Sequence, residues 1–242
     1  MFHFLKKNTV LKDLIPSNFV DIHSHLLPGI DDGAETIEDT IFLSMELQKI
    51  GFEQFITTPH IMNNVWENTK ESIETTFIST IPKLKNPNNF RYASEYMVNP
   101  NFIKLFQEGT LLTLKENFVL IEISYINPPI QLYDILFDLQ IAGYRPVLAH
   151  PERYPYYHKN FSEYEKLKNA GCLFQLNLLS TVGYYGSEVA KSCELLLKKG
   201  FIDFVGSDVH HAKHIEAFSN RIIFKELESL NKAIENNQFF RK

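Results

Sequence analysis

Histidine, aspartate and glutamate recur at one kind of place in this chain of 242 residues, directly after short runs of apolar and β-branched residues. Imidazoles and carboxylates without a thiolate suit zinc, manganese or iron. In an extended strand, residues two apart point to the same side, so His23 and His25 can present both rings to one ion. The candidate metal ligands are His23, His25, Asp32, His60, Glu95, Glu122, His150, Asp208 and His210.

The joint pattern favours a metal site over the simpler interpretation of each residue alone. One histidine at a strand end is usually a hydrogen-bonded structural residue. That interpretation does not explain why five histidines and four acids all occur at or soon after strand ends. Four carboxylates in a poorly hydrated pocket would repel one another, and cations would offset that repulsion. The histidines expected at the surface are His3, His158, His211 and His214. The acids expected on solvated faces or at helix starts include Glu38, Asp39 and Glu152.

The apolar runs that precede these residues predict seven strands. The predicted strands cover residues 19–23, 54–58, 90–95, 118–123, 146–150, 173–177 and 203–207. The amphipathic segments between them predict helices, among them residues 36–50, 130–142, 163–170 and 188–199. Such alternation is typical of parallel β-α units.

The placement of the candidate ligands favours a closed barrel. Six of the seven predicted strands carry one at or just past the carboxyl end, and only the strand over 173–177 does not. In a parallel barrel these ends meet on one face, where barrel enzymes have their active sites. An open doubly wound sheet gives the same alternation, but it would spread the residues along an edge. We therefore expect an α/β fold with seven β-α units in a barrel.

Composition and charge argue against several classes of protein. A formal net charge of −5 and the absence of a Lys/Arg-rich run speak against a nucleic-acid partner. Cys172 and Cys193 form no disulfide framework and fit a reducing compartment. No signal peptide is recognised at the N-terminus, and no apolar stretch approaches the roughly eighteen residues of a membrane-spanning helix. The expectation is a cytoplasmic protein without membrane insertion.

Several motifs resemble those of the polymerase-and-histidinol-phosphatase (PHP) family and follow its order from Phe19 to about His210. They are Asp21-Ile22-His23-Ser24-His25 with Gly29-Ile30-Asp31-Asp32-Gly33, Thr58-Pro59-His60, Ser94-Glu95, Ile121-Glu122, Ala149-His150-Pro151-Glu152-Arg153-Tyr154 and Ser207-Asp208-Val209-His210. The long first motif resembles the branch of bacterial manganese-dependent protein-tyrosine phosphatases of capsule and exopolysaccharide loci. The resemblance implies a distorted (β/α)7 TIM-like barrel. Residues 19–242 would form one PHP-type barrel domain and residues 1–18 an N-terminal arm.

The resemblance also implies three divalent metal ions, with Mn²⁺ first and Fe or Zn²⁺ as alternatives. The ligands implied for the first ion are His23, His25, Glu95 and Asp208. Glu95 would bridge to a second ion, which Glu122 and His150 would share. The ligands implied for the third ion are Asp32, His60 and His210.

The expected reaction is phosphomonoester hydrolysis by a metal-bound hydroxide. Arg153 is the expected phosphate contact, because a planar guanidinium matches two phosphate oxygens. Its alternative role is a salt bridge to the neighbouring Glu152. Asp208 or His210 could relay a proton to the leaving oxygen.

The remaining substrate contacts stay open at this point. Relatives in the resembling branch commonly have an arginine a few residues after Ser-Asp-x-His, but here the segment from His211 to Glu216 contains none. The candidates to take its place are Lys213, His214 and Arg221. Tyr184 and Tyr185 could stack on an aromatic substrate or could simply pack within the fold.

The expected partner is a phosphotyrosine-bearing protein, the tail of a bacterial tyrosine kinase of polysaccharide synthesis. Catalysis by a cysteine nucleophile is excluded, because the Cys-x5-Arg pattern is broken by Leu178 after Cys172 and by Lys199 after Cys193. A small-molecule phosphatase (histidinol-phosphate-like) or a nuclease on the same site is the alternative within enzymes. A non-catalytic metal-stabilised binding scaffold is the alternative from another class.

The two ends of the chain carry weaker expectations, and the oligomeric state is open. The arm over 1–18 could cap the amino end of the barrel or pack on a neighbour. Residues 224–242 predict a terminal helix on the outside of the barrel, followed by a frayed tail.

Overall fold

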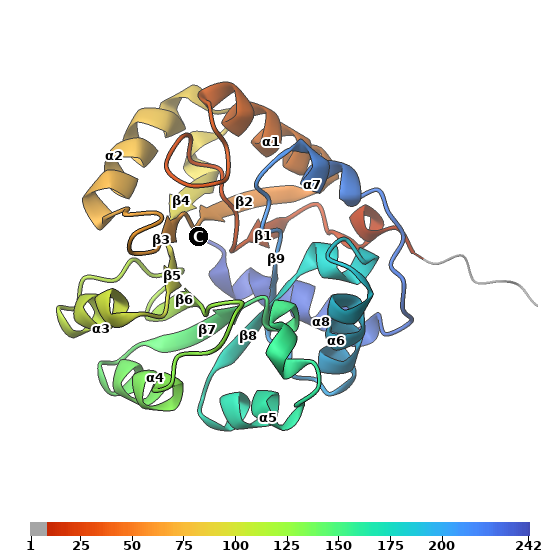
Figure 1. Ribbon diagram of the computed structural model, residues 1–242. Coiled ribbons are helices and arrows are strands. Elements are labelled where there is room, and N and C mark those ends of the chain that lie inside the picture. Colours follow the sequence, from red (N-terminus) through yellow and green to blue (C-terminus); the bar gives the residue numbers. More distant parts are fainter. Residues whose placement is uncertain (1–8) are drawn as a thin grey trace, which may run out of the picture.

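Parallel strands form a ring with helices outside it in the computed structural model, which describes residues 9–242 (Figure 1). The strands are β1 (Phe19–Asp21), β2 (Phe52–Thr57), β3 (His60–Ile61), β4 (Phe90–Tyr92), β5 (Glu95–Met97), β6 (Phe118–Glu122), β7 (Arg145–Ala149), β8 (Leu173–Asn177) and β9 (Phe204–Gly206). Every pairing between these strands is parallel. The prediction of an α/β fold built from parallel units is confirmed.

The ring is divided into two sheets, with strand orders β1-β2-β4 and β3-β5-β6-β7-β8-β9. Two predicted strands are each broken into two pieces. Thr58 and Pro59 separate β2 from β3, and Ala93 and Ser94 separate β4 from β5. Within each broken run, the first piece pairs in the smaller sheet and the second piece in the larger one.

Backbone contacts beyond the strands join the two sheets. Thr58 donates its N–H to the Ser24 carbonyl at 2.7 Å, and Ser24 also forms a parallel bridge with Val209. The bridge closes the ring between β1 and β9. The predicted distorted (β/α)7 barrel is confirmed, and the distortion lies in the two interrupted strands.

Helices surround the ring. They are α1 (Ile37–Ile50), α2 (Lys70–Thr80), α3 (Pro100–Gln107), α4 (Leu132–Ile141), α5 (Ser162–Asn169), α6 (Ser187–Lys198), α7 (Ala212–Ala217) and α8 (Glu228–Asn236). Four of them, α1, α4, α5 and α6, agree with the four predicted segments to within one or two residues at each end. Helix α1 begins with a capping box between Thr36 and Asp39, and Glu38 lies exposed in its first turn. The expected helix-start role of Glu38 and Asp39 is confirmed. No helix in residues 9–242 combines the length and the apolar character needed to cross a membrane.

The C-terminal tail closes the amino end of the barrel, so the prediction of a frayed tail is wrong. Phe240 is fully buried, and its ring lies 5.6 Å from Phe118 and 4.9 Å from Phe204, the first residues of β6 and β9. Asn237 donates to the carbonyls of Val20 and Val205 at 2.9 and 2.8 Å. Figure 1 places the C-terminus near the middle of the ring. The tail therefore fills space that the strands alone leave open.

The described part of the N-terminal arm packs on its own chain. Leu11 is fully buried and donates its N–H to the Asn220 carbonyl at 3.0 Å, and Val10 forms an antiparallel bridge with Arg221. The arm thus lies against the segment after α7. The first eight residues of the predicted arm, with His3, lie outside the described residues.

Candidate metal centre

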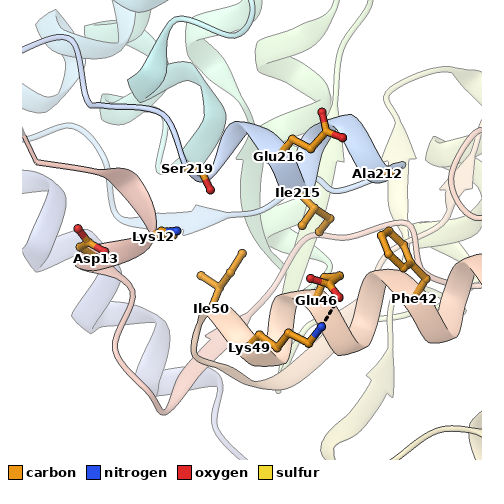
Figure 2. Close-up of a pocket in the computed structure, with 10 residues that line it drawn as sticks. All are labelled: Lys12, Asp13, Phe42, Glu46, Lys49, Ile50, Ala212, Ile215, Glu216 and Ser219. Carbon is orange, nitrogen blue, oxygen red and sulfur yellow. Dashed lines mark hydrogen bonds and ion pairs between the residues drawn. The ribbon is translucent and has the colours of Figure 1, made fainter.

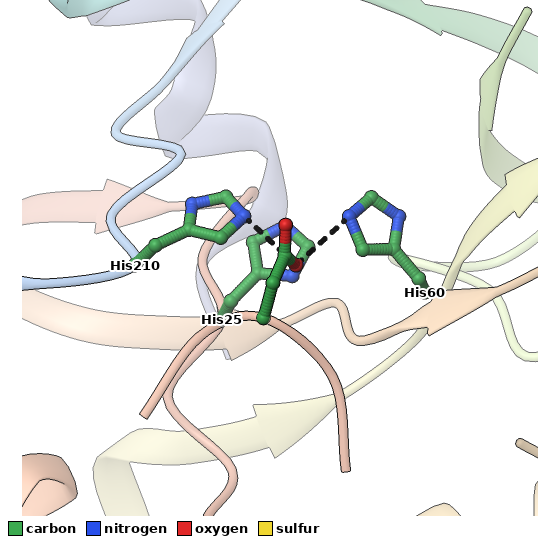
Figure 3. Close-up of side chains that lie close together, drawn as sticks. His25, His60 and His210 are labelled. Atoms are coloured by element: carbon green, nitrogen blue, oxygen red, sulfur yellow. Dashed lines mark ion pairs between the residues drawn. The ribbon is translucent and has the colours of Figure 1, made fainter. Parts of the chain in front are cut away.

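All nine predicted ligands lie at one mouth of the barrel, where His60 and Glu95 are the first residues of β3 and β5 and the others lie at or after the carboxyl ends of strands. The ring centroids of His23 and His150 are 5.6 Å apart, and those of His25 and His60 are 4.5 Å apart. His25 and His210 stack with their centroids 3.9 Å apart. Figure 3 shows His25, His60 and His210 gathered around one carboxylate, with dashed lines for the ion pairs that Asp32 makes at 3.5 Å with His60 and His210.

The ligands fall into three groups, and within each group the ligand atoms lie within 4.8 Å of one another. The groups are His23, His25, Glu95 and Asp208; His25, Asp32, His60 and His210; and His60, Glu95 and Glu122. The first group is the set implied for the first ion. The second contains the set implied for the third ion, with His25 added. The last group contains Glu95 and Glu122 of the set implied for the second ion, with His60 where His150 was implied. His150 is close to the same group, because its Nε2 lies 3.0 Å from Glu95 Oε1.

The charges and burial of this mouth fit bound cations. Burial disfavours the imidazolium of His23, but the carboxylates of Glu95 and Asp208 raise its pKa to about 10. Burial and the nearby charge of Glu95 raise the pKa of Glu122. His60 Nδ1 and Glu122 Oε1 lie 2.9 Å apart, yet both are buried without a hydrogen bond in the described structure. A cation between such atoms would satisfy both lone pairs.

Four of the five candidate histidines have the second ring nitrogen held by a neighbour. The pairs are His25 Nδ1 with Asp31 Oδ2 at 2.7 Å, His23 Nδ1 with Gln175 Oε1 at 2.7 Å, His210 Nδ1 with the Asp208 carbonyl at 2.8 Å and His150 Nδ1 with the Tyr125 hydroxyl at 3.3 Å. Metal-binding histidines are held in this way, because the partner fixes the tautomer and turns Nε2 toward the ion.

Sequence reasoning did not identify Asp31, Gln175 or Tyr125 as functional residues. Asp31 stands directly before Asp32 in the first motif, and that adjacency was the available signal. Gln175 lies on β8, the strand position without an ionisable ligand. That strand instead supplies amides, since Asn177 also donates to Asp208 Oδ2 at 2.8 Å.

Two of the candidate ligands sit on left-handed backbone. The φ angles of His150 and Asp208 are +36° and +50°. This region is uncommon for residues other than glycine and costs about 1–3 kcal/mol where it occurs. The surrounding fold therefore holds both side chains in place against a local backbone preference.

Arg153 lies at the rim of the mouth and pairs with Asp208 rather than with Glu152. Its Nη1 donates to Asp208 Oδ2 at 2.8 Å, and its guanidinium carbon lies 4.2 Å from the ring centre of Tyr185. Tyr125 offers a second ring at 5.2 Å. The ion pair and the two rings fix the guanidinium next to the candidate ligands.

Of the two roles expected for Glu152, the helix-start position is found, in the first turn of the 3-10 helix Pro151–Arg153, and the solvated position is wrong. Its side chain is fully buried and accepts hydrogen bonds from the Asn177 N–H at 3.0 Å and the Ser180 hydroxyl at 2.6 Å. Burial raises the pKa of Glu152 to about 7 against the lowering effect of these bonds. The turn Pro151–Arg153 that follows β7 points this side chain inward, and the sequence does not show that direction.

The histidines outside the predicted ligand set differ in their surroundings. His214 is buried, so its predicted surface position is wrong: the short helix α7 turns it back, and its Nδ1 accepts the His210 N–H at 3.1 Å. His158 is half-buried, with Nε2 2.7 Å from the Glu152 carbonyl oxygen. His211 is exposed as predicted.

The other candidate substrate residues differ in their burial and in their contacts. Tyr185 packs against Arg153, and its hydroxyl accepts a hydrogen bond from Asn177 at 3.0 Å. Tyr184 is 38% exposed and packs edge-on against His214. Lys213 and Arg221 are exposed. Tyr185 thus has a packing role, while the side chain of Tyr184 remains open to solvent.

The sequence of this chain is similar to those of bacterial tyrosine phosphatases. Residues 19–221 match the sequence model of a family described as "Capsular polysaccharide synthesis, CpsB/CapC". The tyrosine-protein phosphatase YwqE of Bacillus subtilis (strain 168) is 29% identical over 198 residues, which are 80% of this chain and 78% of YwqE. The tyrosine-protein phosphatase CpsB of Streptococcus pneumoniae is 25% identical over 201 residues, 79% of this chain and 83% of CpsB.

Solved structures show the same relation. The crystal structures of YwqE from Bacillus subtilis and CpsB from Streptococcus pneumoniae, metal-dependent tyrosine phosphatases, include a chain with a TM-score of 0.79 and 27% identity. The match covers 91% of this chain and 93% of that one. An amidohydrolase from Mycoplasma synoviae, with a TM-score of 0.54 and 13% identity, shares the fold alone.

Proposed function

Because the chain belongs to the CpsB/CapC family of capsular polysaccharide synthesis, we propose that it is a metal-dependent protein-tyrosine phosphatase. The observation that carries the proposal is the meeting of nine histidine and carboxylate side chains at one barrel mouth. The names of the relatives support the choice of phosphotyrosine over other phosphoesters.

Three divalent ions would be held by the sets that the family resemblance implied. The proposed ligands are His23, His25, Glu95 and Asp208 for the first ion, Glu95, Glu122 and His150 for the second, and Asp32, His60 and His210 for the third. The grouping of atoms adds His25 to the third set and His60 to the second. Mn²⁺ is the proposed ion because the branch that the sequence resembles is manganese-dependent, and imidazoles and carboxylates without a thiolate suit it as they suit zinc or iron. Such ions lower the pKa of water and offset charge on phosphoryl oxygens when bound.

Arg153 is proposed to bind the phosphoryl group. One of its five N–H groups is bonded to Asp208, and the described structure gives its guanidinium no other hydrogen bond. The remaining donors are free to meet phosphate oxygens in the planar arrangement that a guanidinium offers. Asp208, Tyr185 and Tyr125 orient the group before substrate arrives. Phosphoryl transfer is helped mainly by such preorganised charge.

Asp208 and His210 fit ligand roles better than proton donation. Both oxygens of Asp208 already face donors, with Oδ2 bonded to Arg153 and Asn177 and Oδ1 3.2 Å from His23 Nε2. The Nδ1 of His210 donates to a carbonyl, which leaves Nε2 with a lone pair. A tyrosine phenolate, with a conjugate pKa near about 10, leaves with little help from an acid. The substrate class and the geometry therefore agree.

A phosphotyrosine tail of a bacterial tyrosine kinase is the proposed substrate, and the cytoplasm is the proposed location. Cys172 and Cys193 are both free and buried, as in a reducing compartment.

A substrate comparison tests the proposal. Chelated protein, with and without Mn²⁺ added back, is assayed on a phosphotyrosine peptide, histidinol phosphate and single-stranded DNA. We expect metal-restored hydrolysis of the peptide above the other two. Asp208→Asn should abolish it, and Asp134→Asn on the exposed face of α4 is the matched control. If Mn²⁺ restored cleavage of DNA alone, the result would favour the nuclease alternative. If Mn²⁺ restored hydrolysis of none of the three substrates, only the non-catalytic scaffold would fit.

A further inference from the structure

A groove leaves the metal centre between α1 and α7. A cavity of about 250 Å³ is lined at one end by Asp32 and His210, two of the proposed ligands, and on its walls by Phe42 and Ala212. A second cavity of about 570 Å³ is lined by the same Phe42 and Ala212. The two cavities therefore lie next to each other on either side of Phe42 and Ala212, and together they are named here the α1/α7 groove.

The outer part of the groove offers an apolar floor with charged residues at its rim (Figure 2). Phe42, Ile50 and Ile215 supply the apolar surface, and Phe42 is 47% exposed. Lys49 pairs with Glu46 on the same helix. Lys12 stands at the far end, and its ammonium makes no hydrogen bond or ion pair within residues 9–242.

We propose that the α1/α7 groove binds the polypeptide on one side of the phosphotyrosine in an extended conformation. This inference rests on the proposed function, since it needs a phosphotyrosine at the metal centre. An extended chain turns every second side chain to the same face, so apolar side chains can meet the floor of Phe42, Ile50 and Ile215 while polar groups meet the charged rims. An acidic substrate residue at the far end would pair with Lys12.

The length of the groove sets how much of the substrate it can hold. Phe42 and Ile50 are eight positions apart on α1, which corresponds to about 12 Å of helix at 1.5 Å per residue. An extended chain rises about 3.3 Å per residue, so this distance holds about four residues. Residues farther from the phosphotyrosine would lie outside the groove.

The presence of Asp32 and His210 in its lining distinguishes this groove from a second apolar pocket near the mouth. That pocket, of about 450 Å³, lies between the start of α3 and the loop after β6, and it includes the fully exposed Ile130. None of its lining residues is a proposed metal ligand. It provides the competing path for the substrate chain.

Peptide length tests the groove. The value of kcat/KM is measured for phosphotyrosine peptides extended by zero to eight residues on either side, and for a small aryl phosphate. We expect kcat/KM to rise with the first four or so residues on one side only and then to stay constant. A value independent of peptide length on both sides overturns the proposal.

Variants locate the contact. Phe42→Ala removes the apolar floor, and Glu216→Trp fills the outer cavity from an exposed position. Each should lower the ratio of long-peptide to aryl-phosphate kcat/KM about tenfold, as truncation of a contact aromatic does. Met45→Ala, exposed on α1 outside the groove, is the control. A loss with Ile130→Ala instead assigns the substrate chain to the other pocket. Failure of the wild type to hydrolyse aryl phosphate refutes the proposed function itself.

Discussion

Asp31 offers the sharpest test of how the proposed ligands are oriented. Its Oδ2 lies 2.7 Å from His25 Nδ1 and also accepts the His60 N–H at 3.2 Å, while Oδ1 accepts the Gly33 N–H at 2.9 Å. In Asp31→Asn, an amide nitrogen replaces one of the two accepting oxygens. If Oδ1 keeps Gly33, the new NH2 group faces His25 Nδ1 and the His60 N–H, both donors. The proton of His25 would then move to Nε2, the nitrogen that faces the centre.

The expected cost follows from that tautomer change. Loss of a carboxylate that orients a metal-binding histidine lowers metal affinity or activity about 10–100-fold. This corresponds to about 1.4–2.7 kcal/mol of binding free energy. The effect should fall on His25, which lies in two of the three ligand groups. More than one ion should therefore bind less tightly.

The assay is a Mn²⁺ titration of the chelated protein, with aryl-phosphate turnover as the readout. We expect half-activation of Asp31→Asn at 10–100 times the wild-type Mn²⁺ concentration, with most of kcat recovered at saturation. Asp134→Asn, an exposed acid on α4, controls for the loss of one charge. An unchanged half-activation concentration would refute the role given to Asp31.

Three further changes test other parts of the structure. In Gly33→Ala, the new Cβ would lie 2.2 Å from the His25 carbonyl oxygen, so the loop must shift. The Mn²⁺ concentration that gives half-activation should then rise at least tenfold in the same titration. Burial raises the pKa of Glu152 from 4.5 to about 7, so between these pH values the folded state holds a proton that the unfolded state has released, and the contribution of Glu152 to stability should fall by about 3 kcal/mol as the pH rises from 4.5 to 7. Urea unfolding of chelated protein across this range should show a flatter profile for Glu152→Gln, and equal slopes would contradict the assignment. Phe240→Ala should lower the free energy of unfolding, measured in urea, by about 3–5 kcal/mol because the ring is fully buried. A loss under about 1 kcal/mol would instead indicate a frayed tail.

The parts of the structure that the sequence predicted depend on short-range patterns. Strand β8 was predicted at the observed residues, because residues 173–177 form an apolar run bounded by a glycine-containing turn. The ligands were found because parallel strands place His60, Glu95 and Glu122 at the same end of the ring. Both inferences use only periodicity and chain direction.

The parts that were missed depend on contacts between distant segments. Gln175 and His23 are 152 residues apart, and an amide in a strand carries no sign that it will meet an imidazole. Phe240 belongs to a polar C-terminal segment, and only the open end of the barrel gives its ring a place. The break at Ala93 and Ser94 arises where the run changes from one sheet to the other. Sequence periodicity contains none of these relations.

One measurement tests the central claim most directly: metal content and phosphotyrosine hydrolysis determined on the same samples during stepwise Mn²⁺ loading of the chelated protein. The account predicts that turnover is absent without metal and rises with occupancy toward about three ions per chain. Full turnover by metal-free protein would contradict it, and so would saturation with Mn²⁺ without any hydrolysis.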